Sequence, residues 1–532
     1  MKTFVRLLTL LLALLMLAMT VVACDEGDDT EDDIGNSAVA DTFGREGDDL
    51  PADLDYKQDE ISVLNWNAEN PEFDIETISA DNVQNALYDR NGEIERRLSV
   101  SLTFTTEEGD VSHMKPFVAL VQRVYESETH DFDIIASYSR TEGMLAIQGY
   151  LEDLKLISDS YINLDKPWWP DNMISTVSIA DSMYFISGDI SPNVLHLMQV
   201  LYFNKNMLNQ YWNQEAINRG VTAELDEDGK EIVSAAARMI YQWAYDGTWT
   251  LDKLIELSHG ADGEGIYIDN GETADTKDPL DTYGFTSTAY QIDCFYTGSN
   301  LRLIEHVDTG EVLKVSDDYG SFKTVRLVDE MGKWFRTSSC YTEANSSGNY
   351  AKSWNKGKAM FVAMRAHGVK NLDADGWSYG VMPVPKYNEK QANYYTCMGN
   401  PFTLYGIFKG MATSPSTQRP DVTRSGDRPA ALREMTAIIE CWASETYRLV
   451  TPEVFEVNMQ LKYADTQYET DMFEIVRSSV VFDLGRIFAN DMAYMSELPS
   501  RSAVYGASWA STYASYKNSL NTKLEQIVEK LA

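Results

Sequence analysis

The chain has 532 residues and a formal net charge of −38, from 82 acidic and 44 basic residues. This charge argues against nucleic-acid binding, where basic patches carry affinity, and against docking on an anionic bilayer by charge. Thirty Tyr, 19 Phe and 11 Trp suit a packed core and also a site that stacks on a ligand with apolar faces and a polar rim. The length is sufficient for two lobes.

The N-terminus has the layout of a secretory signal. Lys2 and Arg6 precede an apolar run over residues 7–19, and residues 21–23 (VVA) lead into Cys24. A positive n-region, an apolar h-region and a small residue at the cleavage point are typical of such signals. The run is short for a membrane span, which needs about 20 residues. We therefore expect export from the cytoplasm.

A cysteine directly after Ala23 resembles the lipobox of bacterial lipoproteins. The resemblance implies that residues 1–23 are removed as a signal peptide and that the Cys24 thiol is diacylated at the mature N-terminus. We therefore expect an extracytoplasmic protein anchored to the bacterial cell membrane by lipid. The alternatives are an ordinary secretory peptide with an incidental cysteine and an uncleaved anchor.

The segment after the cysteine is strongly acidic. Residues 24–58 are dense in Asp and Glu, with Gly, Ser and Ala between them, and Arg45 is the only basic residue before Lys57. Like charges at this density repel, and the segment has little apolar surface to offset the entropy of ordering. We predict a disordered, extended tether over residues 24–58. Binding of a cationic partner is the alternative.

Helix and strand patterns alternate along the rest of the chain. Strands are predicted at residues 60–65, 100–105, 131–137, 183–187, 197–204, 360–363 and 379–383. Helices are predicted at residues 82–98, 113–126, 235–245, 251–258, 430–444 and 519–532, with exposed loops at 260–281 and 413–428. The alternation favours βαβ units and a mainly parallel sheet.

The sequence contains no complete motif of a metalloprotease, serine hydrolase, phosphate-binding loop or dinucleotide-binding fold. The six histidines are scattered, and two acidic turns, residues 224–229 and 371–376, lack the final Glu of a calcium loop. We therefore expect no catalytic residue, no cofactor and no metal. The cysteines after Cys24 are widely spaced and fit two disulfides or free thiols equally well; they are Cys294, Cys340, Cys397 and Cys441.

Four local patterns occur in a fixed order. Residues 131–135 (DFDII) precede residues 149–154 (GYLEDL), and these are followed by residues 201–206 (LYFNKN), 357–360 (GKAM) and 379–385 (YGVMPVP). Together they resemble the extracellular solute-binding proteins of ABC importers, the large two-lobed class that includes sugar binders. No single motif is specific, and the resemblance rests on their shared order over about half of the chain.

The resemblance implies an α/β fold with mainly parallel sheets, in which two lobes are joined by a hinge and the ligand cleft lies between them. It implies that lobe 1 spans residues 59–188 and returns over residues 399–477. Lobe 2 is expected over residues 189–398, with a C-terminal part over residues 478–532.

Ligands in open α/β sheets bind beyond the carboxyl ends of the strands, so residues that follow strands are the candidates for ligand contact. A buried Trp66, a solvated Arg140, a turn-capping Asp189 and core aromatics in place of Tyr290 and Tyr296 are the alternatives. The expected ligand-binding residues are Trp66, Asn67, Glu69, Tyr138, Ser139, Arg140, Asp189, Tyr290, Asp293, Tyr296, Arg365 and Asn400.

The function that the resemblance implies is capture of a small soluble nutrient for the transmembrane subunits of an ABC permease. An oligosaccharide suits aromatic faces combined with Asp, Asn and Arg side chains. We expect a monomer that is not an enzyme and does not bind nucleic acid. A lipid-anchored glycan hydrolase and a surface sensor or adhesin component are the alternative functions.

Overall fold

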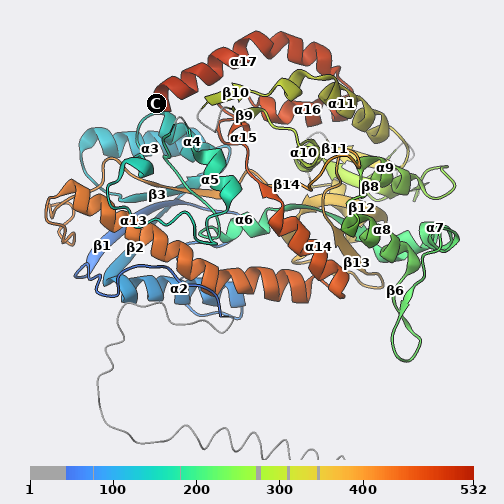
Figure 1. Ribbon diagram of the computed structural model, residues 1–532, viewed down its shortest axis with the longest axis horizontal. Coiled ribbons are helices and arrows are strands. Elements are labelled where there is room, and N and C mark those ends of the chain that lie inside the picture. Colours follow the sequence, from blue (N-terminus) through green and yellow to red (C-terminus); the bar gives the residue numbers. More distant parts are fainter. Residues whose placement is uncertain are drawn as a thin grey trace, which may run out of the picture.

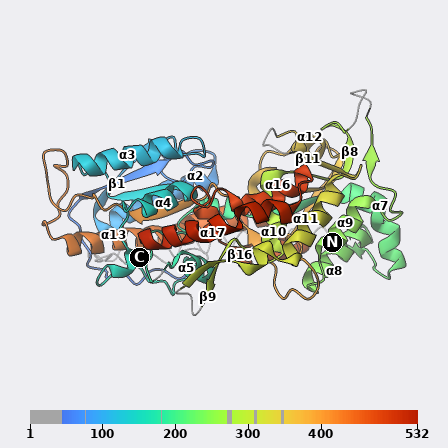
Figure 2. The same ribbon diagram turned by 90° about the horizontal axis from the view of Figure 1, so that it is seen from above.

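The computed structural model describes residues 44–75, 77–179, 181–270, 277–307, 312–343 and 348–531. It shows two lobes side by side, each built around one β-sheet, with the chain crossing between them more than once (Figures 1 and 2). Among the helices of these described residues, none combines the length and the apolar character needed to cross a membrane.

Lobe 1 contains a four-stranded sheet in the order β15-β3-β1-β2. β1 pairs in parallel with both β2 and β3, while β15 returns from the other lobe and pairs antiparallel with β3. β3 is buried throughout and β1 nearly so, as expected for strands covered on both faces. The strand bounds are β1 Asp59–Trp66, β2 Val100–Glu107, β3 Ile134–Tyr138 and β15 Thr403–Ile407.

Helices cover both faces of this sheet (Figure 1). α2 packs against α13 on one side, and α3 packs against α4 on the other. The chain leaves β1 in one direction to reach β2 and passes back over β1 to reach β3, so right-handed crossovers place α2 and α3 on opposite faces. The helix bounds are α2 Asn82–Leu98, α3 Met114–Ser127, α4 Ser139–Ile147, η1 Leu154–Leu156, α5 Asp171–Val177 and α13 Arg428–Glu445.

Lobe 2 contains a larger sheet in the order β11-β8-β12-β4-β13. β8 is parallel to β11 and β12, whereas β4 is antiparallel to β12 and β13. The strand bounds are β4 Gln199–Asn204, β7 Tyr267–Ile268, β8 Thr282–Thr288, β11 Cys340–Glu343, β12 Ala359–Arg365 and β13 Tyr379–Met382. Two hairpins lie outside this sheet, formed by β5 Glu224–Leu225 with β6 Glu231–Val233 and by β9 Ile304–Val307 with β10 Val312–Val315.

The helices of lobe 2 surround its sheet, and α7 and α8 pack closely together. Their bounds are α7 Lys205–Asn218, α8 Ala235–Tyr245, α9 Leu251–His259, α10 Ala289–Gly298, η3 Asp317–Gly320, α11 Phe322–Phe335, α12 Tyr350–Asn355 and η4 Ala366–Val369.

Two helices, α2 and α8, have the bounds that the sequence predicts, and capping residues fix their first turns. The Asp81 side chain accepts from the backbone amides of Val83 and Gln84, and the Ser234 hydroxyl accepts from the amide of Ala237. The strand predicted at residues 183–187 is wrong. In this buried stretch Ile186 alone forms a bridge, with Tyr405 of β15, so no continuous ladder forms.

Two extended crossings join the lobes. The first contains the short helix α6 Pro192–His196 and enters β4 of lobe 2. The second starts at β14 Thr396–Cys397 and enters β15 of lobe 1. They run antiparallel, since Met198 forms a bridge with Met398 and the amide of Gly399 donates to Leu197 O at 2.9 Å.

A third, helical crossing follows α13. The helix continues through two π-helical segments, η5 Thr446–Val450 and η6 Glu453–Lys462, and then reaches α14 Gln467–Ser478. α14 packs against β13 and therefore belongs to lobe 2. The predicted return of lobe 1 over residues 399–477 is too long, because its last residues lie in this helix. π-helical turns often mark places where a helix adapts to function, which suits a position between two lobes.

The C-terminal elements contact both lobes, so residues 478–532 are not confined to lobe 2 as predicted. The C-terminal helix crosses both lobes in Figure 2: the Trp509 indole donates to Tyr319 O of lobe 2 at 3.0 Å, and the Tyr184 hydroxyl of lobe 1 donates to Leu531 O at 2.7 Å. This anchoring explains why the helix begins ten residues before the predicted start at residue 519. The bounds are β16 Val480–Val481, α15 Leu484–Ile487, η7 Met495–Glu497, α16 Leu498–Tyr505 and α17 Trp509–Leu531.

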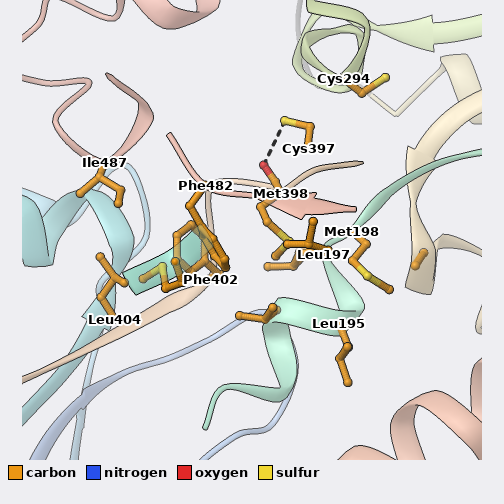
Figure 3. Close-up of a cluster of buried hydrophobic side chains, with 14 of the residues drawn as sticks. Leu195, Leu197, Met198, Cys294, Cys397, Met398, Phe402, Leu404, Phe482 and Ile487 are labelled. Atoms are coloured by element: carbon orange, nitrogen blue, oxygen red, sulfur yellow. Dashed lines mark hydrogen bonds between the residues drawn. The ribbon is translucent and has the colours of Figure 1, made fainter. Parts of the chain in front are cut away.

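An apolar core holds the crossings together (Figure 3). Phe402 of the second crossing packs on Phe482 with ring centroids 5.4 Å apart, and Leu195 and Met198 of the first crossing lie in the same cluster. Cys397 lies there as well, and its thiol donates to Met398 O at 3.4 Å. The junction between the lobes is therefore a packed core of its own.

The question of disulfide pairing is answered by the structure. All four cysteines of the described residues are buried free thiols; they are Cys294, Cys340, Cys397 and Cys441. Burial raises the pKa of each thiol, which keeps it protonated at neutral pH. The lobes are large enough to be stable without covalent cross-links.

The predicted tether does not extend to residue 58. Residues 44–58 lie within the described chain and pack on lobe 1, where the Asp48 carboxylate forms a buried ion pair with Arg97 at 2.7 Å. Arg45 donates to Tyr447 O and Glu456, and its guanidinium lies 4.8 Å from the ring centroid of Tyr447. Specific partners on the folded lobe thus order the end of this acidic segment, a circumstance that composition cannot reveal.

Candidate functional site

The carboxyl ends of the parallel strands in both sheets face the region between the lobes. β1 and β3 end at Trp66 and Tyr138 in lobe 1, and β8 and β12 end at Thr288 and Arg365 in lobe 2. Side chains that follow these ends form ion pairs from one lobe to the other. Because ligands of open α/β sheets bind beyond such ends, this region between the lobes, called the cleft below, is the candidate ligand site.

The two aromatic side chains at the strand ends of lobe 1 pack against each other. The ring centroids of Trp66 and Tyr138 are 5.5 Å apart, and the two residues are 2% and 3% exposed. The Trp66 indole also donates to the Thr403 hydroxyl at 2.9 Å. In this structure Trp66 therefore belongs to the core of lobe 1, which is the packing role that the sequence left open.

Arg140 lies in the first turn of α4, where it is buried between the lobes. Its Nη2 donates to Glu497 Oε1, and its guanidinium carbon lies 5.4 Å from the ring centroid of Tyr494. The other oxygen of Glu497 accepts from Arg501 at 2.9 Å. The alternative of a solvated Arg140 is wrong, since only 4% of the residue is exposed.

Ser139 and Asn400 connect α4 to the second crossing. The Ser139 hydroxyl donates to Asn400 O at 2.7 Å, and Asn400 Nδ2 donates to Glu497 Oε1 at 3.3 Å. Three of the expected site residues, Ser139, Arg140 and Asn400, thus lie together next to the Glu497 carboxylate.

Asp293 lies on α10, which begins directly after β8. Its carboxylate accepts from Arg486 of α15 at 3.0 Å, and both side chains are largely buried. Burial raises the pKa of Asp293, and the positive charge of Arg486 opposes that rise. The pair brings an expected residue of lobe 2 close to α15, which contacts α4 of lobe 1.

Glu69 and Arg365 face each other across the two lobes. Arg365 at the end of β12 donates to the Glu69 carboxylate, which also lies 3.4 Å from Nε2 of His367. Partial burial acts to raise the pKa of Glu69. The hydrogen bond with His367 and the charge of Arg365 outweigh this effect and lower the pKa to about 2. An ionised Glu69 therefore joins the lobes at neutral pH.

Two expected residues lie away from this group. Asn67 is exposed, and its side-chain oxygen accepts from the amide of Gly109 at 3.0 Å. Asp189 lies at the junction of the lobes, where it accepts from Arg477 at 3.1 Å and from the Thr451 hydroxyl at 3.4 Å. Both side chains therefore hold neighbouring segments in place.

The two aromatic candidates on α10, Tyr290 and Tyr296, lie in different surroundings. Tyr290 is exposed, with the Arg501 guanidinium carbon 5.3 Å from its ring centroid, so it lies beside the site. Tyr296 packs edge-on against Tyr319 and is 4% exposed, so in this structure it has the core position that the sequence left open as the alternative. Cys24 lies outside the described residues.

Four residues of this region escaped the sequence analysis. Arg486, Tyr494, Glu497 and Arg501 come from the short elements between residues 484 and 505. They were missed because they follow no parallel strand, and the strand-end rule does not apply to them. The left-handed backbone of Tyr494, with φ of 56°, is a conformation that sequence pattern does not indicate.

Arg140 lies near the ring of Tyr138, with its guanidinium carbon 6.0 Å from the ring centroid. Burial raises the pKa of Tyr138, and the positive charges of Arg140, Arg486 and Arg365 oppose that rise. Among the described residues, the Nε atoms of Arg140 and Arg365 and Oδ1 of Asn400 are buried without a hydrogen-bond partner. Such groups are costly unless a ligand pairs with them.

A hollow of about 890 Å³ lies on lobe 2, away from the carboxyl ends of the strands. It is lined by Trp377, Lys352 and the acidic turn with Asp373 and Asp375. Within the described part of the chain, no group of three or more His, Cys, Asp or Glu side chains is placed to hold a metal ion.

No protein-family model matches the chain, and no curated protein matches its sequence. Solved structures do resemble it. The galacto-N-biose/lacto-N-biose I-binding protein of an ABC transporter from Bifidobacterium longum, in complex with lacto-N-biose, superposes with a TM-score of 0.51 at 11% identity. That match covers 89% of this chain and 98% of the other. The chain has the fold of a two-lobed solute-binding protein.

Two further structures show lower similarity. The maltose-maltodextrin binding protein of Alicyclobacillus acidocaldarius has a TM-score of 0.46 at 11% identity, over 88% of this chain and 99% of that chain. The GacH receptor of Streptomyces glaucescens has a TM-score of 0.45 at 14% identity, over the same shares of the two chains. The predicted α/β fold with two lobes is confirmed by the first comparison and by the two sheets described above.

Proposed function

We propose that the protein captures a saccharide in the cleft between its lobes, outside the cytoplasm, and delivers it to an ABC permease. The fold supports binding between lobes, and the structurally similar protein from Bifidobacterium longum is described as a sugar binder of an ABC transporter. The proposal includes anchoring through a lipid on Cys24, in agreement with the signal and the following cysteine.

The observation that carries the proposal is the convergence of polar side chains from both lobes. Arg140 and Asn400 come from the lobe 1 side, and Asp293 and Arg365 come from lobe 2. Two buried donors, Nε of Arg140 and of Arg365, and two buried acceptors, Oδ1 of Asn400 and of Asp293, have no partner in the described chain. A ligand rich in hydroxyl groups, which both donate and accept, can satisfy both kinds of group.

We propose binding without turnover. The carboxylates of this region, Glu69, Asp293 and Glu497, are each engaged by at least one arginine. Glycoside hydrolysis needs one carboxyl group that can donate a proton to the leaving oxygen and a second on the other side of the bond. Engagement by arginine and His367 lowers the pKa of Glu69 to about 2, which favours its ionised form and opposes the acid role.

A thermal-shift screen of the purified protein against a glycan panel tests the proposal. A saccharide at 100 times its Kd should add about 2.7 kcal/mol to the free energy of unfolding, which a melting curve detects. Incubation with the same glycan should release no product. If no saccharide raises the melting temperature, the proposal is wrong, and the appearance of cleavage products would favour a hydrolase.

A matched pair of variants localises the binding site. Asn400→Ala removes an amide at the cleft and should weaken saccharide binding about tenfold, because a buried hydrogen bond is lost. Asn355→Ala removes an exposed amide beside the hollow on lobe 2 and should leave saccharide affinity unchanged. The reverse result would place the saccharide in that hollow.

A further inference from the structure

Arginine side chains gather in the cleft of a strongly acidic protein. Four guanidinium groups face three carboxylates there, in the pairs Arg140 and Arg501 with Glu497, Arg365 with Glu69, and Arg486 with Asp293. The whole chain carries 82 acidic and only 44 basic residues. These ion pairs contain one more guanidinium group than carboxylates, and two further buried carboxyl groups belong to the same region, Glu142 in the first turn of α4 and Glu343 at the end of β11.

The carboxylates do not saturate the arginines. Glu497 is shared between Arg140 and Arg501, and Glu69 is shared between Arg365 and His367. A second layer, in which Arg302 and Asp483 influence each other, adds one charge of each sign.

The unsatisfied side-chain nitrogens are donors. Arg140 is 4% exposed, and among the described residues its Nε has no acceptor; the same is true of the buried Nε of Arg365. The guanidinium fork matches two oxygens of an anionic group better than it matches a single hydroxyl. An anionic group would therefore supply the acceptors that these two nitrogens lack.

The backbone of α4 also favours an anionic group. α4 begins at Ser139, directly after β3, and the side chain of its N-cap residue Tyr138 makes no capping hydrogen bond. The positive end of the helix dipole thus lies beside Arg140, in its first turn.

Resting on the proposed function, we infer that the saccharide bound in the cleft is anionic and that Arg140 and Arg365 hold its acid group. The acid group is a uronate carboxylate or a sulfate ester on the sugar ring. The ring of Tyr494, next to Arg140, offers an apolar face for the sugar that carries it.

Affinity for matched glycans tests this inference. Calorimetric titration compares α-1,4-trigalacturonate with the galactotriose obtained by reducing its carboxyl groups, and a sulfated trisaccharide with its unsulfated parent. At least one anionic member should bind about tenfold or more tightly than its neutral parent. Neutral parents that bind as tightly as both acids would overturn the inference while the proposed function stands. If neither acids nor neutral glycans bind, the proposed function fails with it.

Variants test the assignment of the arginines. Arg365→Gln should lower the ratio of acid to neutral affinity about tenfold, whereas a merely structural role would weaken both ligands equally. Arg140→Gln should lower the same ratio, and circular dichroism and melting curves identify any variant that fails to fold. Arg326→Gln on the exposed face of α11 is the control and should leave the ratio unchanged. A ratio unchanged in both folded cleft variants would overturn the assignment.

Discussion

At the scale of single residues, Trp66 shows how burial decides between packing and ligand contact. Its ring is 2% exposed and packs on Tyr138. We expect Trp66→Ala to lower the free energy of unfolding by about 3–5 kcal/mol, as for other large core deletions, in urea denaturation. Phe322→Ala, at a site that is 79% exposed, is the control and should change stability by less than about 0.5 kcal/mol. If Trp66→Ala left stability unchanged, Trp66 would not be a core residue, and ligand contact would be its expected role.

Glu440 on α13 gives a prediction about pH. Burial raises the pKa of Glu440 to about 7, against the opposing effect of the hydrogen bond that the Trp169 indole donates at 2.9 Å. The folded state therefore binds a proton that the unfolded state, with a pKa near 4.5, has already lost. The stability contributed by the protonated group is fully present below about pH 4.5 and is lost as the pH rises through about 7.

The variant Glu440→Gln tests this sign, because glutamine keeps an acceptor for Trp169 and cannot ionise. Relative to wild type, it should gain about 3 kcal/mol of stability between pH 4.5 and pH 8, measured by urea denaturation across that range. Glu126→Gln on the exposed face of α3 is the control, with no such gain expected. A variant that keeps the wild-type slope would show that Glu440 is ionised throughout.

At the scale of elements, residues 44–50 form a strap that belongs to lobe 1. Asp48 pairs with Arg97 through side chains that are 0% and 1% exposed, and Arg97 also pairs with Glu445 of α13. We expect Asp48→Ala to lower the free energy of unfolding by about 3 kcal/mol, because a buried charge loses a partner. Asp53→Ala, at an exposed position just after the strap, should have no measurable effect. Equal melting temperatures for the two variants would contradict a structural role for the strap.

At the scale of the whole molecule, the ion pairs between the lobes describe a closed arrangement. Arg140 with Glu497 and Arg365 with Glu69 form when the lobes are together. Two lobes joined by crossings should open without ligand and close with it, because only the closed state contacts the ligand from both sides. Small-angle scattering should show a smaller radius of gyration after a binding saccharide is added. A non-binding saccharide is the control, and an unchanged radius with both would contradict closure.

The proposed lipid anchor makes the position of the molecule in the cell depend on Cys24. Cys24→Ala should prevent lipidation and release the protein from the membrane fraction, while the melting temperature of the folded part stays the same. Fractionation of host cells followed by immunoblotting measures this, with Cys441→Ala as a control that keeps the lipidation site. Tight membrane association of the Cys24 variant would contradict a lipid anchor.

Local signals in the sequence determined much of the fold. The caps at Asp81 and Ser234 and the periodicity behind them fix helices α2 and α8, because capping and amphipathic pattern act within a few residues. The strand-end rule located Ser139, Arg140, Asp293 and Arg365, since parallel strands bring their carboxyl ends to one edge. These inferences use interactions that are short along the chain.

Tertiary structure alone decided the rest. Arg486, Tyr494 and Glu497 belong to short elements and turns between residues 484 and 505, and only the folded chain brings them to α4. The acidic composition of residues 44–58 predicted disorder, yet Arg97, which lies far along the chain, pairs with Asp48 and orders the segment. Burial of Trp66 and Tyr296 likewise depends on neighbours from distant segments, Thr403 and Tyr319. The sequence thus determined which residues end strands and begin helices, and long-range packing decided which of them gather between the lobes and which stabilise the core.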